Sequence, residues 1–157
     1  MEIYFQLVTD GESLKKACDD LKTQPFLGFD VETTHLDPYK GDLRLVQLSD
    51  GKNTKVIDLK PFREKGDLRK LPELAPLRDL LASTRQTMVA HNAKFDTKWV
   101  RHHLGIEVGS IYDTYLASVL VAAGVQLNVR LVHALRGKSA RAEPIALKFE
   151  TGRAFFA

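Results

Sequence analysis

The sequence predicts an α/β fold in which a mixed sheet is flanked by helices. Two observations carry this prediction. The β-rich runs at residues 26–31, 44–49 and 54–59 follow one another without an intervening helical pattern, which predicts three successive antiparallel strands. The segments before and after these runs alternate between strand-like and helical patterns, which predicts that further strands join the same sheet in parallel.

The remaining elements follow from local patterns. Residues 3–8 are rich in β-formers, and Asp10 can then cap a helix that extends to about residue 21. The turn at residues 50–53 (DGKN) suits a hairpin between two of the central strands. The charged residues 61–71 predict a loop. In the second half of the chain, helices are expected at residues 72–83, 91–103 and 113–123, with a strand at 86–90.

Composition limits the class of protein. The 157 residues are 44% hydrophobic and 27% charged, as expected for one globular domain with a real core. No apolar run is long enough to span a bilayer, and the first residues (MEIYFQLVTDGES) do not resemble a secretory leader, so we expect a cytoplasmic protein without membrane partners. The only cysteine, Cys18, excludes an internal disulfide and is expected in the core.

Basic charge is concentrated at the end of the chain. Residues 128–157 hold six basic residues against two acids, whereas the rest of the chain is close to neutral. We therefore expect a globular domain over residues 1–126, followed by a divergent basic segment over residues 127–157 that is partly disordered. Such a tail suits nucleic-acid phosphates, and it is equally typical of an exposed, solvated surface.

Two acids end one of the central strands. In FLGFDVETTHLD, Asp30 and Glu32 follow an apolar run, and residues i and i+2 of a strand share one face, so Val31 must point to the opposite face and into the core. Two neighbouring carboxylates repel each other unless solvent, a raised pKa or a cation relieves them. A divalent metal site is one interpretation, and a solvated strand end before a turn is the other.

A second acid-bearing stretch reads MVAHNAKFDTKW. Asn92 and Asp96 are four residues apart and so lie on one face near the start of the expected helix, beside an apolar face with Phe95 and Trp99. Asp96 can thus project toward the edge of the sheet. The alternative is that Asp96 only stabilises the helix dipole, with Asn92 as the N-cap.

Other catalytic patterns are absent or incomplete. The sequence has no Walker lysine loop, G-x-S-x-G elbow, H-E-x-x-H motif or paired cysteines. A haloacid dehalogenase-type phosphatase needs D-x-D, whereas Glu32 occupies the second position here. The adjacent pair His102 and His103 points in different directions on a helix, which argues against zinc.

The segments GFDVETTHLD, RLVQLSDG, VAHNAKFD and YDTYLAS occur in this order between Phe26 and Gly124. Together they resemble the proofreading 3′–5′ exonuclease domain of family A DNA polymerases, of the DNA polymerase I type. That family is a branch of the DEDD exonuclease superfamily, which includes ribonuclease D. The resemblance implies a ribonuclease H-like fold and a site that hydrolyses phosphodiesters at the 3′ end of single-stranded DNA, or of RNA, with two Mg²⁺ or Mn²⁺ ions.

The resemblance also implies roles for individual residues. Asp30 and Glu32 match the first exonuclease motif, where the aspartate bridges both metals and the glutamate holds the nucleophile-side metal. Asp96 matches the second motif and acts near the other metal. The family contacts the 3′-terminal nucleotides at the positions of Thr33, Leu36, Asn92 and Phe95. Asp113 matches a frequent family acid that is not a ligand, and helix capping explains it. A purely structural role for Leu36 in the loop stays open.

The third motif of the family is missing. It reads Tyr-x-x-x-Asp, or pairs a histidine with an aspartate, and supplies a fourth carboxylate. The last tyrosine, Tyr115, is followed four residues later by Val119, and the only acids after Asp113 are Glu143 and Glu150, in unrelated contexts. Two hypotheses follow. Either the chain is an exonuclease that is weak or inactive unless a partner protein or a second copy completes the site, or it is a noncatalytic remnant that binds single-stranded nucleic acid or protein.

Overall fold

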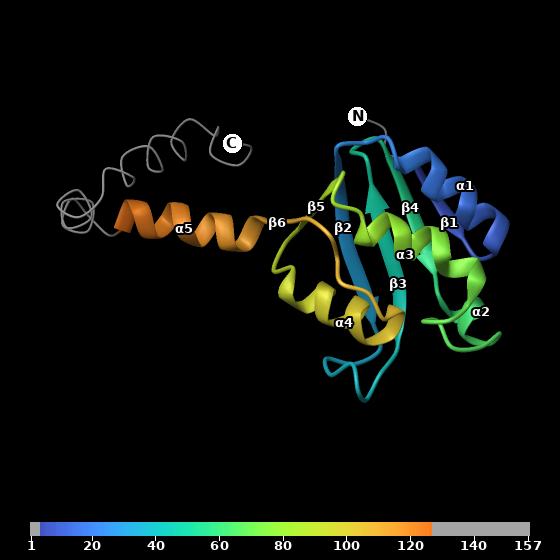
Figure 1. The fold of residues 1–157 in the computed structure, drawn as a ribbon. Helices are drawn as coiled ribbons and strands as arrows, with labels where there is room; N and C mark the ends of the chain where they lie inside the picture. The colour runs from blue at the N-terminus through green and yellow to red at the C-terminus, as the bar shows by residue number, and fades with distance from the viewer. Residues whose placement is uncertain (1–3, 127–157) are drawn as a thin grey trace. The chain divides into compact units, whose positions relative to one another are not determined.

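A computed structural model describes residues 4–126 and contains a six-stranded mixed sheet (Figure 1). The strands lie in the order β1-β4-β3-β2-β5-β6. Their bounds are β1 (Tyr4–Val8), β2 (Phe26–Thr33), β3 (Leu43–Ser49), β4 (Asn53–Asp58), β5 (Thr87–Ala90) and β6 (Ile111–Asp113). β2, β3 and β4 pair antiparallel, whereas β1, β5 and β6 each pair in parallel with a neighbour. The predicted mixed sheet with three successive antiparallel strands is confirmed.

The helices connect these strands. They are α1 (Gly11–Leu21), α2 (Lys60–Arg63), the 3₁₀ turn η1 (Pro72–Leu74), α3 (Ala75–Ala82), α4 (Lys94–Leu104) and α5 (Thr114–Gln126). The side chain of Asp10 caps α1, as predicted, by accepting a hydrogen bond from the backbone N–H of Ser13. Three expectations were wrong in detail. The segment predicted as a loop contains α2, the short strand β6 was not predicted, and α5 continues through Gly124, where we expected it to end.

α1, α3 and α4 cover the same face of the sheet (Figure 1). Each of these helices connects two parallel strands, β1 to β2, β4 to β5 and β5 to β6, and all three connections step across the sheet in the same direction. Right-handed crossovers that step in one direction place their helices on one face. The apolar residues of this face form the core with Leu14 of α1, Leu77 of α3 and Trp99 of α4.

Strand pairing separates the two faces of the sheet. On the helix-covered face, Ile57, Val46 and Val31 lie opposite one another across β4, β3 and β2, and all three are buried. One residue earlier in β2, on the opposite face, the exposed Asp30 lies opposite Gln47 of β3. A shift of one residue therefore moves the sequence from core to surface, which fixes the register.

The first compact unit of the chain ends at Thr114, and α5 belongs to the second unit, which is described only as a helix as far as Gln126. The segment 127–157, for which we expected partial disorder, lies outside the described residues. Within residues 4–126, no helix is both long and apolar enough to cross a membrane.

Candidate active site

β2 presents Asp30 and Glu32 on its exposed face. Exposed and buried residues alternate along the strand, and Phe29 and Val31 are both buried in the core. The predicted shared face of the two acids is confirmed. A register shift between Glu32 and Thr33 ends the regular pairing with β3 just after the second acid, so both carboxylates lie near the end of the strand.

Asp96 lies near the start of α4, as predicted, and in its first turn because the helix begins at Lys94 rather than at residue 91. Its carboxylate is buried against β2. Its side chain is only 3% exposed. One carboxylate oxygen, Oδ1, accepts a hydrogen bond of 3.1 Å from the backbone N–H of Val31, the residue between the two acids. This N–H is available because β5 pairs with β2 only over Phe26 to Gly28, which leaves the next part of this strand edge open. The short pairing thus brings Asp96 beside the strand that carries Asp30.

The surroundings of Asp96 favour its neutral form. Burial, and next the negative charge of Asp30, raises the pKa of Asp96 to about 6, while the hydrogen bond from Val31 acts in the opposite direction. The charge of Asp113 adds a smaller upward shift of this pKa. Asp96 and Asp30 are therefore close enough to repel each other, and a bound cation would relieve that repulsion.

Asp113 holds the turn between β5 and α4. Its two carboxylate oxygens accept hydrogen bonds from the backbone N–H groups of Asn92, at 3.0 Å, and Ala93, at 2.9 Å. These donors precede the first turn of α4, so Asp113 caps the helix that carries Asp96. We expected Asp113 to cap a helix in its own segment, and it instead fixes an element about twenty residues earlier in the chain.

Asn92 lies in the turn between β5 and α4. Its backbone has a φ of 61°, in the left-handed region, which asparagine tolerates better than most residues. The N-cap position of α4 is Ala93, and no side chain at that position caps the helix. Asn92 therefore precedes α4, so the prediction that it lies on one helix face with Asp96 was wrong, and the alternative in which its side chain is the N-cap does not hold.

The loop at residues 34–42 follows the two acids. Thr33 donates its hydroxyl to the backbone oxygen of His35 at 2.8 Å, and the backbone N–H of Asp42 donates to the Thr34 hydroxyl at 2.8 Å. Leu36, at the tip, is 82% exposed. Phe95 instead packs partly buried against the core, with its ring centroid 6.0 Å from that of Trp99. Of the two apolar side chains expected at the 3′-terminal nucleotides, Leu36 is thus the more accessible.

Gln47 was not singled out in the sequence. It lies directly opposite Asp30 in the β2–β3 pairing, and its amide donates a hydrogen bond of 3.3 Å to Asp30 Oδ2. This contact orients one carboxylate oxygen of Asp30. The signal was present in the sequence as a polar residue at an alternating position of RLVQLS, and it became informative only once the register was known.

The carboxylates suit a divalent cation in chemistry but form only part of a site. Carboxylate oxygens are the hard ligands that Mg²⁺ and Mn²⁺ prefer, and Asp30 acts electrostatically on Asp96. Within residues 4–126, however, no three histidine, cysteine, aspartate or glutamate side chains converge closely enough to hold a metal. The described residues therefore supply two acids near each other, with Glu32 as a third on the same strand face as Asp30.

Comparison with known proteins shows the family of the chain. A family model described as 3′–5′ exonuclease matches residues 5–137, which is most of the sequence. The chain belongs to this 3′–5′ exonuclease family. Among curated members, it is 39% identical over 118 residues to DNA polymerase I of Aquifex aeolicus, a match that covers 74% of this chain and 17% of that protein.

Relatives of the exonuclease family include ribonucleases. The chain is 28% identical over 123 residues to ribonuclease D of Zymomonas mobilis, covering 78% of this chain and 30% of the relative. The chain therefore spans less than a third of the length of each of these two relatives. Most of each relative therefore has no counterpart in this match.

Solved structures share the fold. Escherichia coli RNase D, described as an exoribonuclease, superposes with a TM-score of 0.64 at 22% identity, over 76% of this chain and 29% of that one. Brucella melitensis NrnC with bound Mg²⁺ superposes with a TM-score of 0.58 at 25% identity, over 78% of this chain and 55% of that one. The ribonuclease H-like mixed sheet predicted from the sequence is confirmed, and exonucleases of this family normally use divalent metals.

Proposed function

We propose that this chain is a metal-dependent exonuclease that removes nucleotides from the 3′ end of single-stranded DNA. Membership of the exonuclease family supports the reaction class. The observation that carries the proposal for this chain is the position of Asp96, whose carboxylate is bound to the backbone between Asp30 and Glu32. A buried acid beside another acid is costly for folding, and such arrangements are concentrated at functional sites.

In this proposal, three acids would bind the metal ions and a fourth acid would position one of these three. Asp30 and Asp96, whose charges repel each other, would hold one cation together, and Asp30 would also contribute to the second. Glu32, two residues from Asp30 on the exposed face of β2, would hold the second cation. Bound Mg²⁺ or Mn²⁺ supplies Lewis acidity for phosphodiester hydrolysis. Asp113 acts through the backbone N–H groups before α4 and so positions Asp96.

The nucleic-acid contacts surround these acids. Leu36, at the exposed tip of the 34–42 loop, offers an apolar surface for a terminal base. Thr33 and Asn92 lie at the end of β2 and at the turn before α4, on the two elements that carry the acids. Phe95 contributes only the part of its ring that the core leaves exposed.

The relatives support the type of reaction more strongly than they support one substrate. DNA polymerase I and ribonuclease D both match this chain, and the first match has the higher identity. We therefore propose DNA as the preferred substrate and RNA as the competitor to test. Direct competition between labelled single-stranded DNA and RNA would reverse this assignment if RNA is degraded faster.

A noncatalytic binding role is the second candidate. It is favoured by the finding that no three potential metal ligands converge within residues 4–126. In the catalytic proposal, a second copy of the chain or a partner protein supplies the remaining carboxylate. In both candidate functions, residues 1–126 are the exonuclease-like domain, and residues 127–157 add basic charge.

The decisive experiment is degradation of a 5′-labelled single-stranded DNA oligonucleotide with Mg²⁺ or Mn²⁺. The full chain is compared with the double variant Asp30→Ala, Glu32→Ala and with a matched control, Asp19→Ala, Glu64→Ala, which removes two exposed acids that lie outside β2 and α4. We expect products shortened from the 3′ end with the chain and the control but not with the double variant. No shortening under any condition, with oligonucleotide binding retained, would instead establish the binding role.

Metal binding gives an independent measurement. Isothermal titration with Mn²⁺ should show a larger loss of affinity for Asp30→Ala than for Asp96→Ala, because Asp30 is proposed to contact both ions. Equal losses would contradict the bridging role of Asp30 and leave the family assignment untouched.

A further inference from the structure

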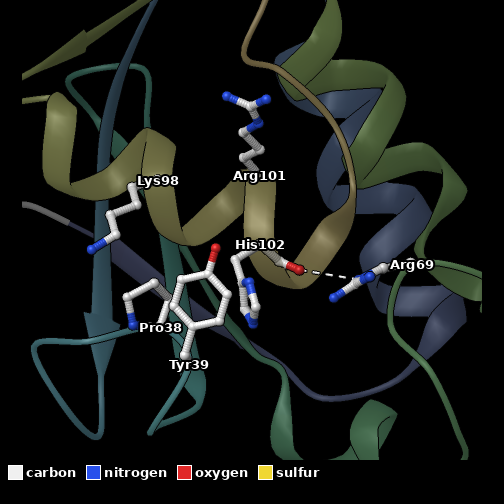
Figure 2. Close-up of a pocket in the computed structure, with 6 residues that line it drawn as sticks. All are labelled: Pro38, Tyr39, Arg69, Lys98, Arg101 and His102. Atoms are coloured by element: carbon white, nitrogen blue, oxygen red, sulfur yellow. Dashed lines mark hydrogen bonds between the residues drawn. The ribbon is translucent and has the colours of Figure 1, made fainter.

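An open, basic pocket lies between the 34–42 loop and the outer face of α4. Its volume is about 480 Å³. We call it the α4 pocket, and its lining residues are Pro38, Tyr39, Arg69, Lys98, Arg101 and His102 (Figure 2). None of these positions belongs to the motifs that led to the family, and none carries an acid. The α4 pocket therefore requires its own explanation.

The cations of the α4 pocket are poorly neutralised. Lys98 has no hydrogen-bond or ion-pair partner among residues 4–126 that would hold its ammonium group. Arg101 pairs with Glu107 at 2.9 Å, but both side chains are about 70% exposed, and such exposed pairs contribute little. Arg69 donates from Nε to the backbone oxygen of His102 at 3.1 Å, a neutral partner that leaves its charge in place (Figure 2). Three positive charges thus border one cavity.

An aromatic ring stands at the same pocket. Tyr39 is 79% exposed, and its ring meets that of His102 edge to face, with centroids 4.5 Å apart (Figure 2). The turn at residues 37–40 presents it, because Asp37 accepts hydrogen bonds from the backbone N–H groups of Tyr39 and Lys40 at 3.0 Å. An exposed aromatic ring beside cations is the combination that binds single-stranded nucleic acids, in which bases stack and phosphates meet positive charge.

The α4 pocket is built on the elements that carry the candidate active site. α4 holds Asp96 on its buried face and, two residues later, Lys98 on the exposed one. The 34–42 loop begins directly after β2, where Asp30 and Glu32 lie. The loop after β2 and helix α4 thus connect the acids to the residues that line the α4 pocket.

We propose that the α4 pocket binds a backbone phosphodiester of the single-stranded substrate on the 5′ side of its terminal nucleotides, with a neighbouring base stacked on Tyr39. Lys98 and Arg101 meet the phosphate, and Arg69 raises the local potential. This proposal rests on the proposed function, because it takes the occupant to be the same strand. The competing explanation is a solvated basic helix face without a ligand.

The test measures binding without cleavage. The full chain is titrated into a labelled single-stranded oligothymidylate in the presence of EDTA, at several NaCl concentrations, and the affinity is followed by fluorescence anisotropy. For single strands, each phosphate contact contributes about 0.7 to the slope of log affinity against log salt. Lys98→Gln, Arg101→Gln should therefore lower the magnitude of this slope by about 1.4 and weaken binding roughly 25-fold at 0.1 M salt, if each side chain meets one phosphate.

A charge-matched control separates a site from general attraction. Lys16→Gln, Lys52→Gln removes two exposed lysines from α1 and from the β3–β4 turn, and it should leave the slope nearly unchanged. Equal effects of the two double variants would overturn the proposal, as would an unchanged slope for Lys98→Gln, Arg101→Gln or an absence of measurable binding by the unaltered chain.

Substitutions of Tyr39 test the stacking part. Tyr39→Ala should weaken binding at least about fivefold at every salt concentration without changing the slope, because stacking is not ionic. Tyr39→Phe keeps the ring and should restore the affinity. A phenylalanine variant as weak as the alanine variant would overturn the stacking role. Because no metal is present, a catalytically inactive chain can still pass this test, and an active exonuclease can still fail it.

Discussion

The two faces of α4 differ in what they contribute. The buried face carries Asp96, Trp99 and Val100 and packs on the sheet, whereas the exposed face carries Lys98 and Arg101 and borders a pocket. One face holds the acid that we propose binds a cation, and the other holds the cations that we propose meet a phosphate. The comparison teaches that a single helix can carry a buried acid on one face and basic side chains on the other, only a few residues apart in the sequence.

The largest loss of stability is expected from a substitution on the buried face of α4. Trp99 is fully buried, and its ring stacks on that of His103 with centroids 5.2 Å apart. Trp99→Ala should lower the free energy of unfolding by about 3–5 kcal/mol, measured by urea denaturation. Trp99→Phe is the control, because it keeps an aromatic ring and removes an indole N–H that has no hydrogen-bond partner among the described residues. A small loss for the alanine variant would mean that this face of α4 is not anchored by the core.

Asp96 lies on the same face, but its replacement should raise the free energy of unfolding rather than lower it. The pKa of Asp96 in the folded protein, about 6, lies above its ordinary value of 3.8, so ionised Asp96 lowers stability above pH 6 and this penalty fades as the pH falls toward 4. Asp96→Asn should therefore raise the free energy of unfolding by about 1–3 kcal/mol at pH 8, in the absence of metal, and by less than about 1 kcal/mol near pH 4.

The check on Asp96→Asn is the pH dependence rather than the size of the gain. Urea midpoints are compared at both pH values, with Asp19→Asn on the exposed surface of α1 as the control. A gain that is the same at pH 4 and pH 8 would show that the stabilisation does not come from the charge of Asp96.

Asp113 holds the turn before α4, and its removal should lower the free energy of unfolding by less than the removal of Trp99 does. Asp113→Ala leaves the backbone N–H groups of Asn92 and Ala93 without their carboxylate partner. We expect a loss of about 1–2 kcal/mol in the free energy of unfolding, as for other helix caps. Amide exchange measured by NMR should accelerate first at the start of α4. Faster exchange spread evenly over the sheet would contradict a local capping role.

The smallest effect on stability is expected on the exposed face. Lys98→Gln, Arg101→Gln should change the free energy of unfolding by less than about 0.5 kcal/mol, because exposed side chains without strong partners contribute little. Thermal denaturation by circular dichroism provides the measurement. A large loss of stability would show that both faces of α4, and not only the buried one, stabilise the fold.

The sequence predicted features that depend on local periodicity. The alternation around Val31 placed Asp30 and Glu32 on one face, and the helical spacing placed Asp96 in a first turn, because both patterns extend over several residues. β6 was missed because a strand of three residues is too short to show a period. The assignment of Asp30, Glu32 and Asp96 as metal ligands remains a prediction.

Features that join distant segments were not predictable in this way. Asp113 caps a turn that precedes it by about twenty residues, and the left-handed backbone of Asn92 follows from the geometry of that turn rather than from its neighbours in sequence. The α4 pocket brings Tyr39 to His102, which lie far apart in the chain. Neither arrangement has a sequence period, since each depends on how the sheet places its connections.

The short pairing of β5 with β2 gives the backbone N–H of Val31 an unusual partner. In a longer strand pair this group would be tied to another backbone, and its surroundings would be insensitive to the chemistry of the site. Here it donates to the carboxylate of Asp96, so the resonance of a single amide should shift as that carboxylate loses its proton or turns toward an added cation. The fold thus carries a built-in spectroscopic probe of its own acids, which can be read without substrate and without turnover.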